Sequence, residues 1–331
     1  MKYASLIPVA VVSLALFSPT VWSADPNAVV FTDPEKADKD FDVQGEYLGT
    51  VDDGTVVGIQ VIALGNHEFE TVAYIGGLPG QGWARGEERY RGKGHSDGTG
   101  VKFEGTGDSA GRGGVWKDGV IEVHDEYGDI LVKAKKVERK SSTLGQAPPA
   151  GAIVLFDGSG VDQFEDAKLV DGKYLGATNC YTKQKFGDHQ LHIEFRTPYM
   201  PTARGQGRGN SGVYLQSRYE LQVLDSFGLE GENNECGGIY SISKPNTNLC
   251  FPPLSWQTYD IDFTAAKYDD DGKKTANARA TIRHNGIVIH DDLELTHGTP
   301  GRFAEGPGPE AIFLQNHGNP VVFQNIWVVE K

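Results

Sequence analysis

The segment SGVYLQSRYELQVLDSF, from Ser211 to Phe227, alternates polar and apolar side chains. Successive side chains of a β-strand point to opposite faces, so this pattern predicts strands with one apolar and one polar face. The apolar face, which we expect to pack against another sheet, holds Val213, Leu215, Ser217, Tyr219, Leu221 and Val223. The polar face holds Tyr214, Gln216, Arg218, Glu220 and Gln222. We expect a two-residue turn near Ser217 to join two strands as a hairpin.

Two further segments repeat this alternation. His192 and Glu194 alternate with apolar residues in HQLHIEFR, and Gln315 and His317 alternate with Ile312, Leu314 and Asn316 in IFLQNHG. Three such rows on neighbouring strands would form the floor of a groove, whereas a single row would only face water. Gln, Arg, Glu, His and Tyr offer directional hydrogen bonds and an aromatic plane, which suit a polyhydroxylated ligand. The rows therefore predict a sugar-binding groove.

Carboxylates in such a groove could act on a glycosidic bond. Glu220, Gln222 and Asp225 follow the spacing E-x-D-x-x-E of some jelly-roll glycosidases, with Gln and Asp at the second and third positions. Positions five apart in a strand face opposite ways and lie about 17 Å apart, so only a bulge would bring Asp225 to Glu220. A glycosidase with two carboxylates would therefore use Glu194 as the second one.

The elements that would position these residues are β-strands. Short apolar runs and Gly-rich turns predict a β meander or small sandwich, in a domain over residues 30–139. The stretch KSSTLGQAPPAGA predicts a linker over residues 140–151. Residues 152–331 contain further strand runs, with DG at Asp271 and NG at Asn285 where hairpin turns are expected. The predicted fold class is all-β, a small Gly-rich β domain followed by an antiparallel jelly-roll sandwich.

Residues 1–23 predict a signal peptide. Lys2 precedes an apolar run from Leu6 to Phe17, and small residues stand at Ser23 and Ala24. A membrane helix needs about 20 apolar residues, so we expect no membrane span after cleavage. The expected location is periplasmic or extracellular. A formal charge of -14 argues against nucleic acid and anionic membrane surfaces as partners.

Export would permit disulfides among the three cysteines, Cys180, Cys236 and Cys250. A bridge between Cys236 and Cys250 would close the Gly-, Pro- and Asn-containing stretch CGGIYSISKPNTNLC, and we favour that pair. The other two pairings stay open, because spacing does not determine connectivity. The sequence has no C-x-x-C motif and no Cys/His zinc pattern.

The second domain, from about Ala152 to Lys331, resembles the 3-keto-disaccharide hydrolase family. The resemblance rests on LFDGSG, LHIEFRTP, GNSGVYLQSRYELQVLDS, WQTYD and AIFLQNHGNPVVFQNIWV, in this order. Two positions depart from the family pattern: Gln324 stands where Arg is usual, and Gln257 where Asn is frequent. The resemblance implies a concanavalin-like jelly roll that cleaves glycosides already oxidised at C3 of the sugar.

That chemistry requires a base and a group that stabilises an enolate, rather than a pair of carboxylates. Our hypothesis makes Glu220 or His317 the base, and Arg218 or a bound divalent cation the stabilising group. The residues expected to position the sugar are Gln222, Gln315 and Asn210.

No cofactor beyond such a cation is expected, and His192 with Glu194 is the candidate metal pair. Two alternatives use the same groove. A non-catalytic carbohydrate-binding module would use Tyr214 and Trp256 as stacking platforms, and an ordinary glycoside hydrolase would use Glu220 and Glu194. In each case the partner is a sugar or a glycoside.

Overall fold

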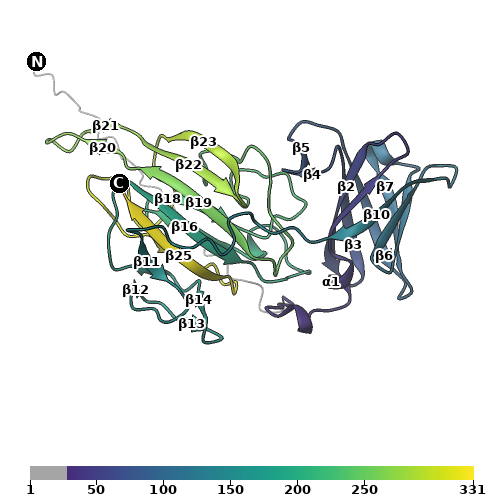
Figure 1. The fold of residues 1–331 in the computed structure, drawn as a ribbon, viewed down its shortest axis with the longest axis horizontal. Helices are drawn as coiled ribbons and strands as arrows, with labels where there is room; N and C mark the ends of the chain where they lie inside the picture. Colours follow the sequence, from purple (N-terminus) through teal and green to yellow (C-terminus); the bar gives the residue numbers. More distant parts are fainter. Residues whose placement is uncertain (1–27) are drawn as a thin grey trace, which may run out of the picture.

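A computed structural model describes residues 28–331, in which two β units are joined by one extended segment (Figure 1). The all-β fold expected from the sequence is confirmed. The predicted signal peptide lies outside the described residues. Within residues 28–331 no helix is long and apolar enough to cross a membrane. The helical turns are Pro34–Lys36, Asp40–Val43 (α1), Gly107–Ser109 and Gly205–Gly207.

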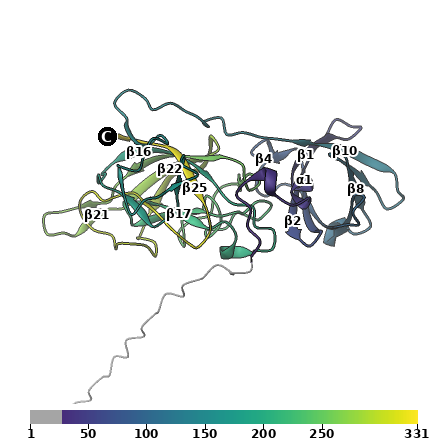
Figure 2. The same cartoon turned by 90° about the horizontal axis from the view of Figure 1, so that it is seen from below.

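The N-terminal unit is a closed barrel in the order β1-β10-β9-β8-β7-β6-β3-β2. Its strands form an antiparallel meander that closes where β1 pairs with β10, so the expected meander is confirmed and the small sandwich is not formed. Figure 2 shows the ring of strands. The strands are β1 Gly45–Thr50, β2 Val56–Gly65, β3 Glu68–Ile75, β6 Arg89–Ser96, β7 Val101–Thr106, β8 Gly113–Lys117, β9 Val120–His124 and β10 Ile130–Val137, and β4 Leu78–Pro79 pairs with β5 Gly82–Trp83 outside the ring.

Strand β2 of the barrel is buried on both faces. On one face of β2, Val57, Ile59 and Val61 belong to the core inside the barrel. On its other face, Ile62 belongs to a separate cluster that includes Phe227 of the C-terminal unit. A strand that is buried on both sides carries a nearly continuous apolar run, as in VVGIQVIALG.

The C-terminal unit consists of two sheets that sandwich a core. The larger sheet has the order β13-β14-β25-β16-β19-β22-β23, with β11 paired to β25, and the smaller has the order β12-β15-β24-β17-β18. The strands of the larger sheet are β11 Ile153–Phe156, β13 Leu169–Val170, β14 Tyr174–Gly176, β16 His189–Arg196, β19 Gln257–Thr264, β22 Ala278–His284, β23 Ile287–Leu295 and β25 Val322–Glu330. Those of the smaller sheet are β12 Phe164–Glu165, β15 Cys180–Thr182, β17 Ser211–Leu215, β18 Tyr219–Val223 and β24 Phe313–Leu314, and β20 Lys267–Tyr268 pairs with β21 Lys274–Ala276.

The two sheets share one apolar core. Leu191 and Ile193 of β16 are buried in it together with Val213 of β17 and Leu221 of β18. The apolar faces predicted from alternation are therefore confirmed for both segments. Asn285 and Gly286, at φ 53° and 84°, form the expected tight turn between β22 and β23.

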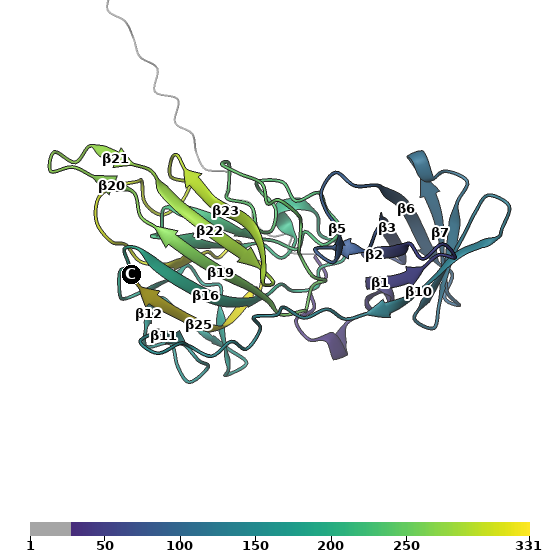
Figure 3. The same ribbon diagram turned by 45° about the horizontal axis from the view of Figure 1, so that its top comes forward.

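The two units are in direct contact as well as connected. Arg85, in the loop after β5, donates hydrogen bonds to the backbone carbonyls of Glu230, Gly231, Pro245 and Asn246. The connecting segment runs from β10 to β11 near β25 (Figure 3). The barrel is thus held against the loops of the sandwich.

The cysteines are three buried free thiols. Cys236 and Cys250 contact each other, and burial together with the hydrogen bond to Cys236 raises the pKa of Cys250. The structure contains no sulfur–sulfur bond between them, and their disulfide stays a prediction.

Candidate functional site

The hairpin of β17 and β18 carries the polar face identified in the sequence. Leu215 pairs with Tyr219, which leaves three residues, Gln216 to Arg218, in the turn. The expected two-residue turn is wrong, because it would have placed Leu215 and Tyr219 on opposite faces. The three-residue turn, with Gln216 and Ser217 at φ 51° and 53°, keeps both in the core.

Glu220 is the acid at the centre of this polar face. Burial raises the pKa of its carboxyl to about 7, against the opposing effect of a hydrogen bond with Tyr214. Gly212 on the neighbouring strand makes room for both side chains, since a Cβ there would lie 2.6 Å from Glu220 Oε1 and 2.8 Å from Tyr214 Cε2. A carboxyl with a pKa near neutrality can both accept and return a proton at physiological pH.

Three amide side chains on this face have bonded NH₂ groups and unpartnered oxygens. Gln206 Oε1 accepts hydrogen bonds from Asn210 Nδ2 and Gln222 Nε2, each at 3.1 Å. Gln315 Nε2 donates to Tyr214 Oη at 3.0 Å. The oxygens Asn210 Oδ1, Gln222 Oε1 and Gln315 Oε1 are buried and have no partner among the described residues. Buried polar atoms without a partner are rare, and hydroxyl donors of a ligand would satisfy these three.

We call these residues the polar cluster: Asn210, Tyr214, Glu220, Gln222 and Gln315. The structure places all five close together. Two residues that were not predicted join them, Gln206 through the bonds given above and Tyr240, whose backbone N–H donates to Glu220 O at 3.1 Å. Both lie in loops without periodicity, and the one signal for Gln206 was an amide in the Gly-rich stretch RGQGRGN.

Arg218 lies in the hairpin turn and contacts a loop rather than the polar cluster. Its Nη1 donates to Gly308 O at 3.1 Å and to Gln216 Oε1 at 3.2 Å. Its carbonyl accepts from the backbone N–H of Thr299 at 2.9 Å. In the described part of the chain these contacts join the turn to residues 299–308, and none of them reaches Glu220.

His317 lies in the loop after β24, two residues beyond Gln315, and is half-buried. The same loop borders a cavity of about 390 Å³, which Thr197 and Asn319 also line. Asn319 Oδ1 accepts the backbone N–H of Asn210 at 2.7 Å. Asn319 Nδ2 and Thr197 Oγ1 are buried without a partner in residues 28–331. The loop thus connects the polar cluster to this cavity.

His192 and Glu194 lie on the outer face of the larger sheet, across the core from Glu220. The connecting segment covers them: Gly145 N–H donates to Glu194 Oε1 at 2.6 Å. Asn325 Nδ2 and Gln324 Nε2 donate to the same carboxylate at 2.8 and 2.7 Å. The prediction that this row shares a groove with Glu220 is therefore wrong, and Glu194 cannot act as its second carboxylate.

The His192–Glu194 pair does not resemble a metal site. Burial opposes a charge on either group, but hydrogen bonds with Asp260 and Glu194 raise the pKa of His192. Burial likewise opposes ionisation of Glu194, but hydrogen bonds from His192 and neighbouring amides hold its pKa below the usual range. Within residues 28–331 no three His, Cys, Asp or Glu side chains are grouped to hold a metal ion.

Trp256, which was expected to contact the sugar, and Asp225, the last position of the E-x-D-x-x-E spacing, both lie elsewhere. Trp256 lies beside β19 of the larger sheet, where its ring packs against that of Tyr174 at a tilt of 53°, with the ring centroids 5.2 Å apart. The Arg196 guanidinium lies 5.2 Å from each ring. Asp225 forms a buried ion pair with Arg208 Nε at 2.7 Å. Neither side chain belongs to the polar cluster.

Comparison with known proteins agrees with this architecture. Residues 151–329, more than half of the chain, match the family model described as a 3-keto-alpha-glucoside-1,2-lyase-like domain. A crystal structure described as that of a "putative glycosyl hydrolase" from Parabacteroides distasonis ATCC 8503 is 35% identical, with a TM-score of 0.51, and the match covers 55% of this chain and 85% of that chain. A second structure with the same description and organism is 18% identical, with a TM-score of 0.39, over 55% of this chain and 94% of that chain.

No curated protein is significantly similar to the chain. The family match and the first of these structures support a carbohydrate-active enzyme of the glycosyl hydrolase kind. Through its second β unit, the chain belongs to the 3-keto-disaccharide hydrolase family.

Proposed function

We propose that the protein is an exported enzyme that cleaves 3-keto-glycosides at the polar cluster. The observation that carries the proposal is the position of Glu220, a buried carboxyl with a pKa of about 7 beside three unpartnered amide oxygens. A base with this pKa and a row of acceptors for sugar hydroxyls are what the reaction needs.

Glu220 would act as the base at C2 of the sugar. The C3 ketone acidifies the C2 hydrogen, so the ionised carboxylate can take that proton and leave an enolate. The enolate then expels the C1 substituent, which accepts a proton, and a double bond forms between C1 and C2. Water adds across this bond, with hydroxyl on C1 and hydrogen on C2, and releases the 3-keto sugar. Hydration restores the C2 hydrogen from water, and transfer of the proton held by Glu220 to the departing C1 oxygen returns Glu220 to its ionised form.

The amides of the cluster would hold the sugar for this transfer. Asn210 Oδ1, Gln222 Oε1 and Gln315 Oε1 can each accept a hydrogen bond from a hydroxyl group. Their NH₂ groups are already bonded to Gln206 and Tyr214, which determines the direction of each oxygen. Because these groups are ordered before the substrate arrives, little reorganisation is needed on binding.

The proposed reaction contains no step on a metal ion. The one carboxylate of the cluster, surrounded by amide oxygens, offers hard oxygen ligands that a divalent cation prefers, and such a cation would stabilise the enolate. The candidate pair His192 and Glu194 is already satisfied by protein hydrogen bonds. A chelator arm in the assay tests for a cation directly.

The test is release of 4-nitrophenol from its 3-keto-glucoside and from the unoxidised glucoside, with and without chelator. We expect release from the keto form alone, and a loss of about 10²- to 10⁴-fold in Glu220→Gln, as for removal of a general base. Glu165→Gln, an exposed acid on β12, is the matched control and should keep full activity.

Other outcomes would replace the proposal. Equal release from the unoxidised glucoside would indicate an ordinary glycoside hydrolase. Saturable sugar binding without release from either compound, lost in Glu220→Gln, would indicate a non-catalytic binding module at the same cluster.

A further inference from the structure

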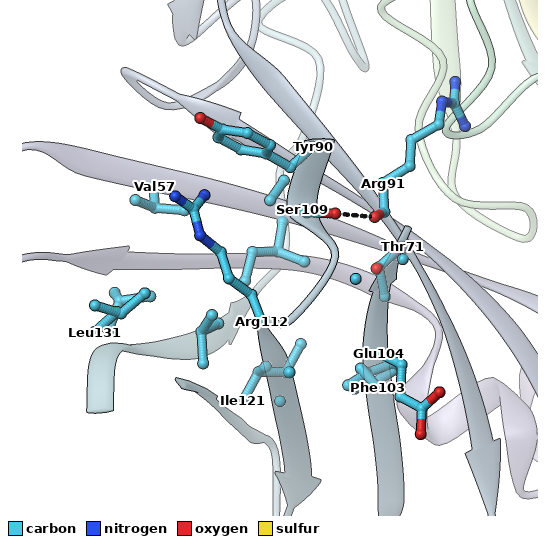
Figure 4. A pocket seen from close by; sticks show the side chains of 18 of the residues that line it. Val57, Thr71, Tyr90, Arg91, Phe103, Glu104, Ser109, Arg112, Ile121 and Leu131 are labelled. Atoms are coloured by element: carbon cyan, nitrogen blue, oxygen red, sulfur yellow. Dashed lines mark hydrogen bonds between the residues drawn. The ribbon is translucent and has the colours of Figure 1, made fainter. Parts of the chain in front are cut away.

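The interior of the N-terminal barrel is only partly filled. At one end, Tyr47 donates a hydrogen bond to the carbonyl of Val43 in α1, and an apolar core packs above it. Toward the other end the barrel contains a cavity of about 170 Å³ (Figure 4). The cavity is open to solvent, and barrels of about eight strands can hold one small ligand, so a space of this size can admit one.

Small residues at inward positions create this space. Along β3 the inward side chains are Phe69, Thr71, Ala73 and Ile75, so the large ring lies in the packed core and the two smaller side chains line the cavity. Gly92 on β6 adds no side chain to the wall. Glycine weakens a strand, and inside one it often marks a position that something else approaches closely.

The remaining wall is mostly aliphatic. Val57 and Ile59 of β2, Ile121 of β9 and Val132 of β10 line the cavity, and the Thr71 hydroxyl is one of its few polar groups. A sugar ring would leave its hydroxyl groups without partners against such a wall, whereas an aromatic ring would not. The barrel cavity and the polar cluster therefore suit different ligands.

A cation lies at the edge of the cavity. The Arg112 guanidinium lies 4.8 Å from the ring of Tyr90, and in the described part of the chain its side chain forms no ion pair or hydrogen bond. The neighbouring Arg91 is paired with Glu230 at 2.7 Å. Figure 4 shows the Glu104 carboxylate directed away from Arg112. Arg112 is thus free to donate to an oxygen atom of a ligand.

We propose that the barrel binds a small molecule with one aromatic ring and a carboxylate or phenolic oxygen. The ring occupies the cavity and the oxygen accepts from Arg112. An apolar cavity of about 150 Å³ is known to hold one benzene ring, so the space suits a single ring and excludes a fused pair. This site is independent of the function proposed for Glu220.

The test is ¹⁹F NMR titration of the full chain with 4-fluorobenzoate, 4-fluorophenol and 6-fluoro-2-naphthoate. We expect saturable binding of the two single-ring probes and none of the naphthoate. Ala73→Phe fills the cavity and should weaken binding at least tenfold. Val115→Phe, which adds the same ring at an exposed position of β8, is the matched control and should bind as the wild type does. Arg112→Gln should weaken 4-fluorobenzoate more than 4-fluorophenol.

Near-ultraviolet circular dichroism shows whether Ala73→Phe is folded, and Thr71→Leu replaces it under the same criterion if it is not. Filling a void should also raise the midpoint of thermal unfolding. The proposal is overturned if the wild type shows no saturable binding of either single-ring probe at millimolar concentration. It is equally overturned if a folded, cavity-filled variant binds both probes with wild-type affinity.

Discussion

Glu220 is buried, and burial disfavours the charged form of its carboxyl group. The raised pKa that results suits its proposed role as a base. Glu220 is 4% exposed, on a strand whose other face enters the core of the sandwich. The hydrogen bond with Tyr214 offsets only part of the effect of burial on its pKa. A base for a neutral-pH reaction benefits from this balance, because a carboxylate with an ordinary pKa of about 4.3 would be a weaker base.

The same balance predicts that Glu220→Gln stabilises the protein at high pH. The folded pKa is raised to about 7, so the folded state binds the proton more tightly than the unfolded state, and stability falls as pH rises from about 4.5 through 7. At 1.36 kcal/mol per pKa unit the loss reaches about 3 kcal/mol by pH 8. Urea unfolding should therefore show Glu220→Gln more stable than the wild type at pH 8 and similar to it at pH 4.5.

In the wild type, kcat/KM for the 3-keto-glycoside should rise with pH as Glu220 ionises near pH 7. A stability difference between Glu220→Gln and wild type that is the same at both pH values would contradict the raised pKa. The Glu165→Gln control should show no difference at either pH.

At the scale of the strands, the alternation of polar and apolar residues predicts which face of a strand each side chain occupies. It does not predict which strands pair with one another. It assigned Val213 and Leu221 to the core and Glu220 and Gln222 to the polar face, because the side-chain period of a strand is two. It could not indicate that the row of Glu194 belongs to the other sheet, since sheet membership depends on pairings between residues far apart in sequence.

Loops account for the other differences between the predicted site and the structure. Gln206 orients two amides of the polar cluster from a loop that has no periodic pattern. The turn at Asn285 was predictable because Asn-Gly favours positive φ at both positions. The turn at Gln216 and Ser217 has positive φ without glycine, so its length was mispredicted.

The connecting segment covers the polar side chains His192 and Glu194 on the larger sheet, which is why they are buried. The variant Glu194→Gln tests how much this contact contributes to stability. The carboxylate accepts from Gly145 N–H and from two amides, so its removal should lower the free energy of unfolding by about 1–3 kcal/mol. Because the folded pKa of Glu194 is lowered, its contribution is present at neutral pH and is lost as pH falls through that pKa.

Urea unfolding at pH 7 and release of the aglycone should be measured on the same preparation of this variant. We expect reduced stability with unchanged turnover, because the apolar core separates Glu194 from Glu220. Glu165→Gln serves again as the exposed control. A loss of turnover in Glu194→Gln comparable to that in Glu220→Gln would restore the two-carboxylate mechanism.

At the scale of the whole molecule, the barrel and the sandwich share an apolar contact. Phe227 of the sandwich is 2% exposed and lies in a cluster with Ile62, Val72 and Tyr74 of the barrel. Gly228 approaches the same surface so closely that a Cβ there would lie 2.4 Å from Ile62 Cδ1. The contacts of Arg85 add hydrogen bonds beside this apolar contact. Unfolding of one unit would expose apolar surface of the other, which couples their stabilities.

Phe227→Ala should therefore separate the two units energetically. Removing a buried phenyl ring costs about 3–5 kcal/mol, and here the cost falls on the contact between the units. Differential scanning calorimetry of the wild type should show a single transition, and the variant should show a lower midpoint with two resolved transitions. Phe303→Ala removes the same ring from an exposed position, where the residue is 44% exposed, and should change the free energy of unfolding by less than about 0.5 kcal/mol. One unchanged transition in Phe227→Ala would show that the Phe227 contact does not couple the barrel to the sandwich.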